Sequence, residues 1–196
     1  MKKFFIAISL ITFLITIMAT TGCNKKGAGS DSPTNKNQTV AEIKTNKGDI
    51  TVVLYTDKTP ETAKNFIELA KEGKYDNTAF HRVIDGFMIQ GGDFENHNGT
   101  GGHSYKGPGT YLEDEIVKGL SHKRGVLSMA NRGPNTGGSQ FFIVQAEDGA
   151  TWLDGAHAIF GHVTEGMEVV DKIAKMPVGP NDAPLEAIFI EKIEIK

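Results

Sequence analysis

Residues 80–94 read FHRVIDGFMIQGGDF, and residues 128–144 read SMANRGPNTGGSQFFIV. Each stretch contains short apolar runs separated by Gly, Asn, Asp or Pro, the residues that favour turns. Repeated short strands between such turns indicate a barrel or a sandwich. The two stretches therefore favour a mainly β domain. They also supply an arginine, glutamines, a methionine and phenylalanines, a mixture that suits an apolar ligand held through its backbone.

Similar runs occur on both sides of these stretches. Residues 40–55 alternate apolar and polar side chains around residues 46–49, which predicts a hairpin of strands 40–45 and 50–55. The other runs that we expect to form strands lie at residues 79–84, 87–90, 126–129, 141–145, 158–163 and 187–195.

Two helices are predicted between the strands. Thr59 suits the N-cap of the first helix, Pro60 its first position and Gly73 its end. Its apolar face consists of Ala63, Phe66, Ile67 and Ala70. Residues 166–175 also have apolar side chains at helical spacing and predict the second helix.

The first 22 residues have the layout of a secretory signal peptide. Two lysines precede an apolar run over residues 4–18, and small residues follow it. A retained membrane anchor is the alternative, although the run is short for a spanning helix. Residues 23–39 are mostly polar and predict a flexible tether, so we expect the folded domain to cover residues 40–196.

Cys23 is the only cysteine of the chain, so no intramolecular disulfide can form. Its place directly after Gly22 resembles the lipobox of bacterial lipoproteins, although Thr20 stands where that family prefers Leu. The resemblance implies cleavage before Cys23 and attachment of lipid to its thiol, with acyl chains such as palmitate. It implies an extracytoplasmic protein, lipid-anchored to a bacterial membrane. A free thiol after an ordinary leader is the alternative.

The two central stretches, followed by Trp152, Leu153 and His157, resemble the cyclophilin family of peptidyl-prolyl cis/trans isomerases in the same order. The resemblance extends over essentially the whole of residues 40–196. It implies a closed antiparallel barrel of about eight strands capped by two helices, with a side-chain core and an active groove on the outer wall. It also implies acceleration of rotation about X-Pro bonds in proline-containing polypeptides, without a cofactor or metal.

Rotation about an X-Pro bond localises a lone pair on the prolyl nitrogen, so a catalyst needs a hydrogen-bond donor there and a pocket for the ring. Arg82 is the expected donor, because its guanidinium is always charged and offers several N–H groups. By itself an arginine is more often a surface ion pair; the resemblance favours the catalytic role. The catalytic residues that it implies are Arg82, Gln90, Phe142 and His157.

The resemblance also implies a set of substrate-binding residues: Phe87, Met88, Gly99, Ala130, Asn131, Gln140, Trp152 and Leu153. Phe141 and Phe142 are adjacent, so in a strand one can fill the core while the other faces the groove. We expect the backbone at Ala130 and Asn131 to pair with an extended peptide. Trp152 implies binding of cyclosporin.

Two residues depart from the family pattern. Asp85 stands where many members have proline, and Arg132 follows Asn131 where a small residue is common. Asp85 could alter the turn before Phe87, and Arg132 could change substrate preference at the edge of the groove.

Other functions have less support. The formal charge of −3 gives no sign of nucleic-acid binding. The six histidines form no H-x-x-x-H pair, and Phe141 replaces the last glycine of a G-x-S-x-G elbow. We expect a monomer. The serious alternative is a catalytically weak module of the same shape that binds proline segments or acts as a chaperone.

Overall fold

A computed structural model describes residues 38–196, in which nine strands form one antiparallel sheet. The predicted leader, Cys23 and most of the tether lie outside the described residues. The strands are β1 Thr39–Thr45, β2 Gly48–Leu54, β3 Thr78–Ala79, β4 Arg82–Ile84, β5 Met88–Gly91, β6 Val126–Met129, β7 Phe141–Val144, β8 Ile159–Glu165 and β9 Phe189–Ile195. Thr39, which we placed in the tether, is the first residue of β1.

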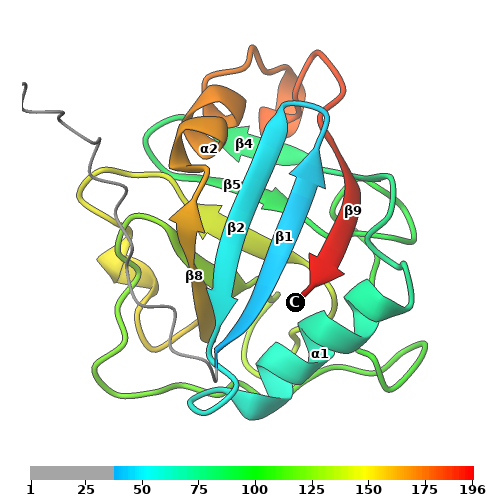
Figure 1. Cartoon of the computed structure of the whole chain (residues 1–196), viewed down its shortest axis with the longest axis vertical. Helices are drawn as coiled ribbons and strands as arrows, with labels where there is room; N and C mark the ends of the chain where they lie inside the picture. The colour runs from blue at the N-terminus through cyan, green and yellow to red at the C-terminus, as the bar shows by residue number, and fades with distance from the viewer. Residues whose placement is uncertain (1–37) are drawn as a thin grey trace, which may run out of the picture. The chain divides into compact units, whose positions relative to one another are not determined.

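The predicted hairpin is confirmed. Strands β1 and β2 pair from Thr39–Leu54 to Thr45–Gly48, so the turn is two residues long. Ala41, Ile43 and Ile50 are fully buried, as the alternation of apolar and polar side chains requires. In Figure 1 this hairpin lies in front of β4 and β5, which cross it from behind. The apolar side chains between these two parts of the sheet form the core.

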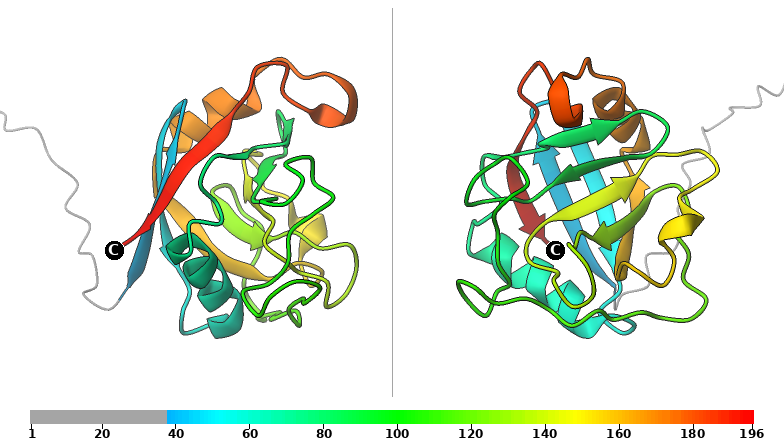
Figure 2. Two further views of the ribbon diagram at one scale, coloured as in Figure 1. Left: turned by 90° about the vertical axis from the view of Figure 1, so that its right-hand side faces the viewer. Right: turned by 180° about the vertical axis from the view of Figure 1, so that it is seen from behind.

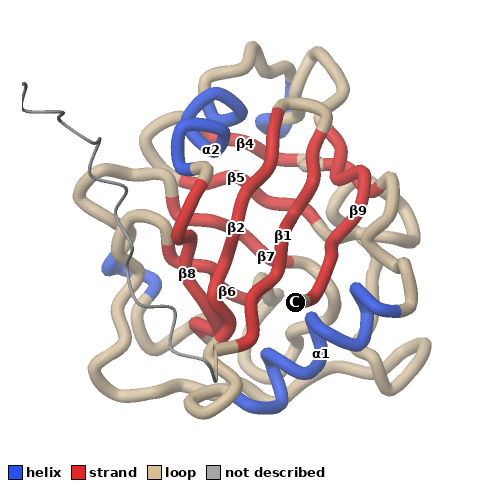
Figure 3. The backbone as a smooth tube through the Cα atoms, viewed as in Figure 1, coloured by secondary structure: helices blue, strands red, loops and turns tan. Residues whose placement is uncertain are grey.

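The prediction of a closed barrel of about eight strands is wrong. The strand order is β3-β9-β1-β2-β8-β6-β7-β5-β4, so the sheet of the described residues is open between β3 and β4. Figures 2 and 3 show that this sheet is curled. These two edge strands are consecutive in the chain, and only residues 80–81 separate them. The chain leaves its pairing with β9 and begins pairing with β5 at this point. Each of the two strands pairs with a different neighbour, and no ladder joins them.

Helix α1 spans Pro60–Lys71 and confirms the first predicted helix. It ends in a Schellman motif, because the N–H of Gly73 donates to Ala70 and the N–H of Lys74 donates to Leu69. Gly73 has a φ of 67°, which suits glycine. Thr59 does not cap the helix with its side chain. Its hydroxyl donates instead to the carbonyls of Tyr55 and Ile159, which ties the start of the helix to the sheet.

Helix α2 spans Met167–Ala174 and confirms the second predicted helix. In Figure 1, α1 and α2 lie near opposite ends of the β1–β2 hairpin. The ring of Phe66 in α1 packs edge-on against Phe141 and also contacts Phe160. Two short 3-10 helices, η1 Thr151–Leu153 and η2 Pro180–Asp182, complete the elements. No helix within residues 38–196 is long and apolar enough to cross a membrane.

Candidate active site

Three of the predicted catalytic residues lie in one row across the sheet. Arg82 in β4 pairs with Gln90 in β5, and Gln90 pairs with Phe142 in β7. Residues that are directly opposite on neighbouring strands point to the same face. The strand register alone therefore places the guanidinium, the amide and the aromatic ring side by side.

This row borders a hollow of about 180 Å³, which we call the Phe142 hollow. Its lining includes nine of the predicted site residues: Arg82, Phe87, Met88, Gln90, Ala130, Asn131, Phe142, Leu153 and His157. Met88 and Phe142 are buried in its wall. Phe141 points to the opposite face and packs in the main core, as the strand alternation predicts.

His157 and Trp152 lie at different depths beside this hollow. The ring of His157 stands edge-on to Phe142, with centroids 5.5 Å apart, and its Nδ1 lies 3.0 Å from the carbonyl oxygen of Met129. His157 therefore lines the hollow and also makes a local hydrogen bond. Trp152 is 66% exposed and does not line the hollow. Its ring packs on Phe87 at 5.5 Å and so borders the site from outside.

A second, narrower hollow of about 80 Å³, the Gln140 hollow, adjoins the first. Both are lined by Gln90, Ala130 and Asn131. Gln90 Nε2 donates to Gln140 Oε1 at 3.0 Å, and Gln140 Nε2 donates to the carbonyls of Gly99 and Gly101. The two glutamines thus form a bridge between β5 and the loop of residues 92–110, which we call the glycine-rich loop.

The expected peptide pairing at Ala130 and Asn131 stays a prediction. The N–H of Ala130 donates to the carbonyl of Gln140 at 2.9 Å, so this group is not free to pair with a peptide. The side-chain amide of Asn131 donates to the carbonyl of Ala156. A peptide that pairs here would use the carbonyl of Ala130 or the backbone of Asn131.

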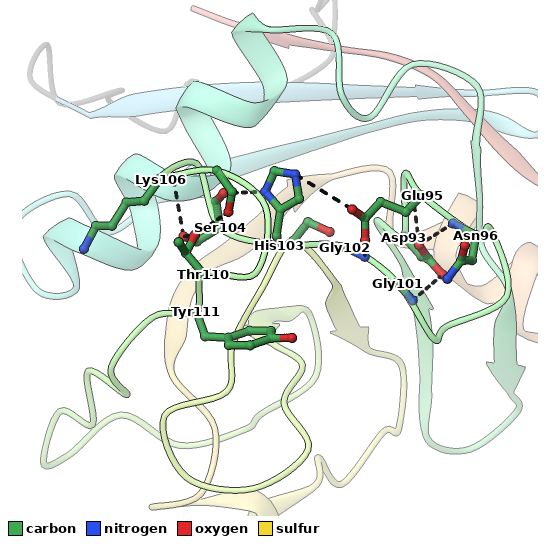
Figure 4. Close-up of polar contacts among 12 residues, drawn as sticks. Asp93, Glu95, Asn96, Gly101, Gly102, His103, Ser104, Lys106, Thr110 and Tyr111 are labelled. Carbon is green, nitrogen blue, oxygen red and sulfur yellow. Dashed lines mark hydrogen bonds and ion pairs between the residues drawn. The ribbon is translucent and has the colours of Figure 1, made fainter.

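Asp93 shapes the glycine-rich loop, a role the sequence analysis missed. Its side chain is buried and accepts hydrogen bonds from five backbone N–H groups, those of Glu95, Asn96, Asn98, Gly99 and Gly101. Burial works to raise the pKa of Asp93, but the N–H donors outweigh burial and hold the pKa below its usual range. Figure 4 shows this carboxylate beside Asn96 and Gly101. An aspartate followed by a run rich in Asn and Gly was the available signal.

The loop continues through a series of polar contacts, also drawn in Figure 4. Glu95 accepts from the N–H of Gly102, and His103 Nδ1 lies 2.7 Å from the carbonyl oxygen of Ser104. The hydroxyls of Ser104 and Thr110 are 2.6 Å apart. The carbonyls of Gly99 and Gly101 are therefore held in a fixed wall beside Gln140.

Asp182 is a second residue that the sequence analysis missed. Arg82 Nε donates to Asp182 Oδ2 at 3.2 Å. Asp182 and Asn181 both have positive φ, of 59° and 62°, so the backbone of η2 makes a tight turn beside β4. This turn borders a wide hollow of about 780 Å³ that also meets Arg82, Gln90 and Gly99. The Arg82 guanidinium therefore lies between the Phe142 hollow and this wide hollow.

Of the two departures from the family pattern, Arg132 lies at the edge of a hollow and Asp85 lies in a turn. Arg132 stacks over the ring of Tyr111 at 5.7 Å and donates to its hydroxyl, at the edge of the Gln140 hollow. Asp85 is exposed in the turn between β4 and β5. Within residues 38–196, no group of three His, Cys, Asp or Glu side chains is placed to hold a metal ion.

Comparisons with known proteins agree with this geometry. Residues 40–195 match the family model for cyclophilin type peptidyl-prolyl cis-trans isomerases. The chain is 52% identical over 156 residues to peptidyl-prolyl cis-trans isomerase cypE of Dictyostelium discoideum, covering 79% of this chain and 96% of that protein. It is 49% identical over 154 residues to peptidyl-prolyl cis-trans isomerase-like 1 of Neurospora crassa, covering 78% and 91%.

Solved structures of cyclophilin type isomerases have the same fold as this chain. A cyclophilin type peptidyl-prolyl cis-trans isomerase of Cryptosporidium parvum superposes with a TM-score of 0.76 at 39% identity, covering 81% of this chain and 98% of that one. The same protein crystallised in the presence of the dipeptide Ala-Pro gives a TM-score of 0.75.

Proposed function

This chain belongs to the cyclophilin-type peptidyl-prolyl cis-trans isomerases, and we propose that it holds the proline ring of its substrate in the Phe142 hollow. The observation that supports this site is the row of Arg82, Gln90 and Phe142 across three neighbouring strands. The row combines an apolar wall with a permanent charge at the mouth of the same hollow.

The chemistry requires little more than these groups. Resonance gives the X-Pro amide partial double-bond character, and uncatalysed exchange takes tens to hundreds of seconds. In the twisted amide the nitrogen lone pair no longer conjugates with the carbonyl, so a donor to that nitrogen stabilises the transition state. To reach about 1 to 10³ turnovers per second, the enzyme must lower the barrier by about 2 to 7 kcal/mol.

Arg82 is the donor in this proposal. Its Nε donates to Asp182, which leaves the N–H groups of Nη1 and Nη2 for the substrate. A charged donor in a partly desolvated site supplies more stabilisation than a neutral one. Phe142, Met88 and Leu153 bury the ring, and His157 fixes the edge of Phe142.

The backbone of the substrate lies across the Gln90–Gln140 bridge in this proposal. Gln90 keeps its second amide hydrogen, and Gln140 Oε1 keeps a second lone pair, for additional hydrogen bonds. Asn131 borders both hollows, so a peptide that passes from one to the other must cross it. The Ala-Pro dipeptide named with the Cryptosporidium structure is the smallest ligand with the required bond.

Titration of the protein with Ala-Pro, followed by two-dimensional NMR, tests the placement. We expect shifts in the signals of Met88, Phe142 and Arg82, with those of Phe141 unchanged. Shifts confined to other parts of the sheet would overturn this assignment.

We propose a lipid-anchored, extracytoplasmic location from the sequence alone. The support is the apolar leader followed by Gly22 and Cys23. In that setting the enzyme would assist proteins whose folding is slowed by proline isomerisation. Expressed in a bacterium with lipoprotein processing, the full chain should partition with membranes and take up labelled palmitate, whereas Cys23→Ser should do neither. Membrane partitioning of Cys23→Ser would refute the lipid anchor.

We also propose that cyclosporin binds at the same groove. Trp152 is exposed and packs on Phe87 at the rim, where it can contact a large apolar ligand. Because Trp152 is the only tryptophan, its fluorescence reports binding directly. Full isomerase activity at high cyclosporin concentration would refute this proposal.

A further inference from the structure

His122 lies just before β6, and its side chain is fully buried behind the Phe142 hollow. Its Nδ1 is 2.7 Å from Asp154 Oδ1, and its Nε2 is 3.0 Å from Ser128 Oγ. The order of Asp154, His122 and Ser128 resembles a hydrolase triad. Ser128 is fully buried in β6, however, so no substrate can reach its hydroxyl. A different role must explain the cluster.

The backbone of His122 clamps the segment that carries η1. Its carbonyl accepts from the N–H of Ala150, and its N–H donates to Asp154 Oδ1 at 2.8 Å. Together with the Nδ1 contact, these bonds fix both ends of residues 150–154. Trp152 and Leu153 lie between the two fixed ends. None of the residues of η1 is fully buried, and only Leu153 packs partly against the apolar cluster that contains Phe142.

The ring of His122 also supports the other wall of the hollow. It stacks on Phe142 with centroids 5.9 Å apart and planes 11° apart. Phe142 is thus held between two rings, because His157 stands edge-on to it at 5.5 Å. His122 therefore contacts the Phe142 wall directly and the Leu153 wall through Asp154.

The titratable groups that face the His122 ring are Asp154 and His157. Burial lowers the pKa of His122, and the nearby His157 adds to this effect, while Asp154 opposes it. The neutral ring donates from Nδ1 to Asp154 and accepts at Nε2 from the hydroxyl of Ser128. Protonation would turn Nε2 into a donor, and the Ser128 hydroxyl would then donate to the carbonyl of Ala158, 3.1 Å away.

From this geometry we infer that His122 is a positioning residue for the isomerase, holding Phe142 and the Trp152–Leu153 segment at the spacing that a proline ring requires. The inference rests on the proposed site, because it assigns the two walls of the Phe142 hollow to substrate binding. His122 is expected to affect binding of the proline ring more than rotation of the X-Pro bond, because it neither lines the hollow nor contacts Arg82.

The test compares His122→Ala with Asp154→Ala and with the double variant, in isomerisation of a short X-Pro peptide. We expect each single change to raise KM about 10-fold and to change kcat less than 3-fold. The double variant should be no worse than the poorer single variant, because all three remove the same link. The fluorescence anisotropy of Trp152 should fall in each of them, which local destabilisation elsewhere would not cause.

His162→Ala is the matched control. His162 belongs to β8, packs on Tyr55 and does not line the hollow. Its Nδ1 has no partner within the described part of the chain. Its loss should leave KM and the Trp152 anisotropy unchanged. Folded His122→Ala and Asp154→Ala with wild-type KM and anisotropy would overturn the inference.

A further variant decides the matter if His122→Ala does not fold. Asp154→Asn keeps the shape of the side chain and should still raise KM and lower the Trp152 anisotropy. Wild-type KM and anisotropy in Asp154→Asn would refute the clamp. A wild-type protein that binds no X-Pro peptide would instead refute the proposed site, and the anisotropy would still test the clamp.

Discussion

Arg82 Nε donates to Asp182 Oδ2 at 3.2 Å, although the two residues are 100 positions apart in the sequence. The contact brings the turn of η2 against β4, at one edge of the open sheet. It fixes the plane of the guanidinium while leaving its terminal N–H groups free to face the hollow. Asp182 is therefore the residue through which the far end of the chain acts on the proposed catalytic group.

Removing the charge of Asp182 should weaken catalysis more than stability. We expect Asp182→Asn to lower kcat/KM about 3- to 10-fold, because the guanidinium loses the partner that orients it. Both side chains are about two-fifths exposed, and such pairs contribute only about 0–1 kcal/mol to stability. Kinetics and thermal unfolding of the same sample check both parts. Unfolding behaviour that changes while kcat/KM stays constant would show that the pair is only structural.

The two adjacent phenylalanines of β7 should respond differently to the same substitution. Phe142→Leu removes part of the hollow's wall, so KM should rise several-fold. Phe141→Leu should cost about 1–3 kcal/mol of unfolding free energy and leave KM unchanged, because Phe141 packs against Phe66 and Tyr75 in the core. Equal effects of the two changes on KM would contradict the assignment of faces.

Local patterns predicted the parts of the fold that depend on neighbouring residues. The hairpin over residues 40–55 and both helices were confirmed. The row of Arg82, Gln90 and Phe142 follows once the strands are paired. Closure of the sheet was predicted wrongly, because it depends on where the chain changes partners between Ala79 and Arg82. No periodicity in the sequence records that change.

Acid should destabilise the protein in part through Asp93. Its folded pKa lies below the ordinary value, so the unfolded state binds its proton more readily. The stability that it contributes is present above about pH 4 and is lost as the pH falls through the lower, folded pKa. Asp93→Asn should lower the unfolding free energy at pH 7 by about 1–3 kcal/mol, because an amide NH₂ would face buried N–H donors.

The measurement for this prediction is urea unfolding at a series of pH values. The slope of stability against pH below about pH 4 should be smaller in Asp93→Asn than in the wild-type protein. Parallel curves for the two proteins would show that Asp93 does not titrate on unfolding. Thr100→Ala, on the exposed side of the same loop, is the control and should keep the wild-type slope.

Gly99 tests how closely the glycine-rich loop approaches the sheet. It has a φ of 90°, and an added Cβ would lie 2.8 Å from His81 Nε2. Gly99→Ala should therefore combine backbone strain with a steric clash, and it should displace the carbonyl that Gln140 binds. Gly119→Ala has nearly the same φ of 93° with nothing within 4 Å of its Cβ. We expect a loss of kcat/KM only in Gly99→Ala; equal losses in both variants would contradict the close approach.

Long-range contacts account for what the sequence analysis missed. Asp93 acts on backbone groups of its own loop, and a signal for it was present in the residues that follow. Asp182 and His122 gave no such signal, because their partners lie 100 and 32 positions away. The resemblance placed Trp152 beside the groove, but the contacts of Asp154 that hold η1 in position could not be predicted from the sequence.

The most direct test of the account is the rate of cis-to-trans isomerisation of a short X-Pro peptide by the wild-type protein, Arg82→Lys and Arg82→Ala. The account predicts strong catalysis by the wild type, a partial loss in Arg82→Lys, which keeps the charge without the fork, and loss of most activity in a folded Arg82→Ala. Wild-type turnover in Arg82→Ala would contradict the role of Arg82 as the donor to the prolyl nitrogen.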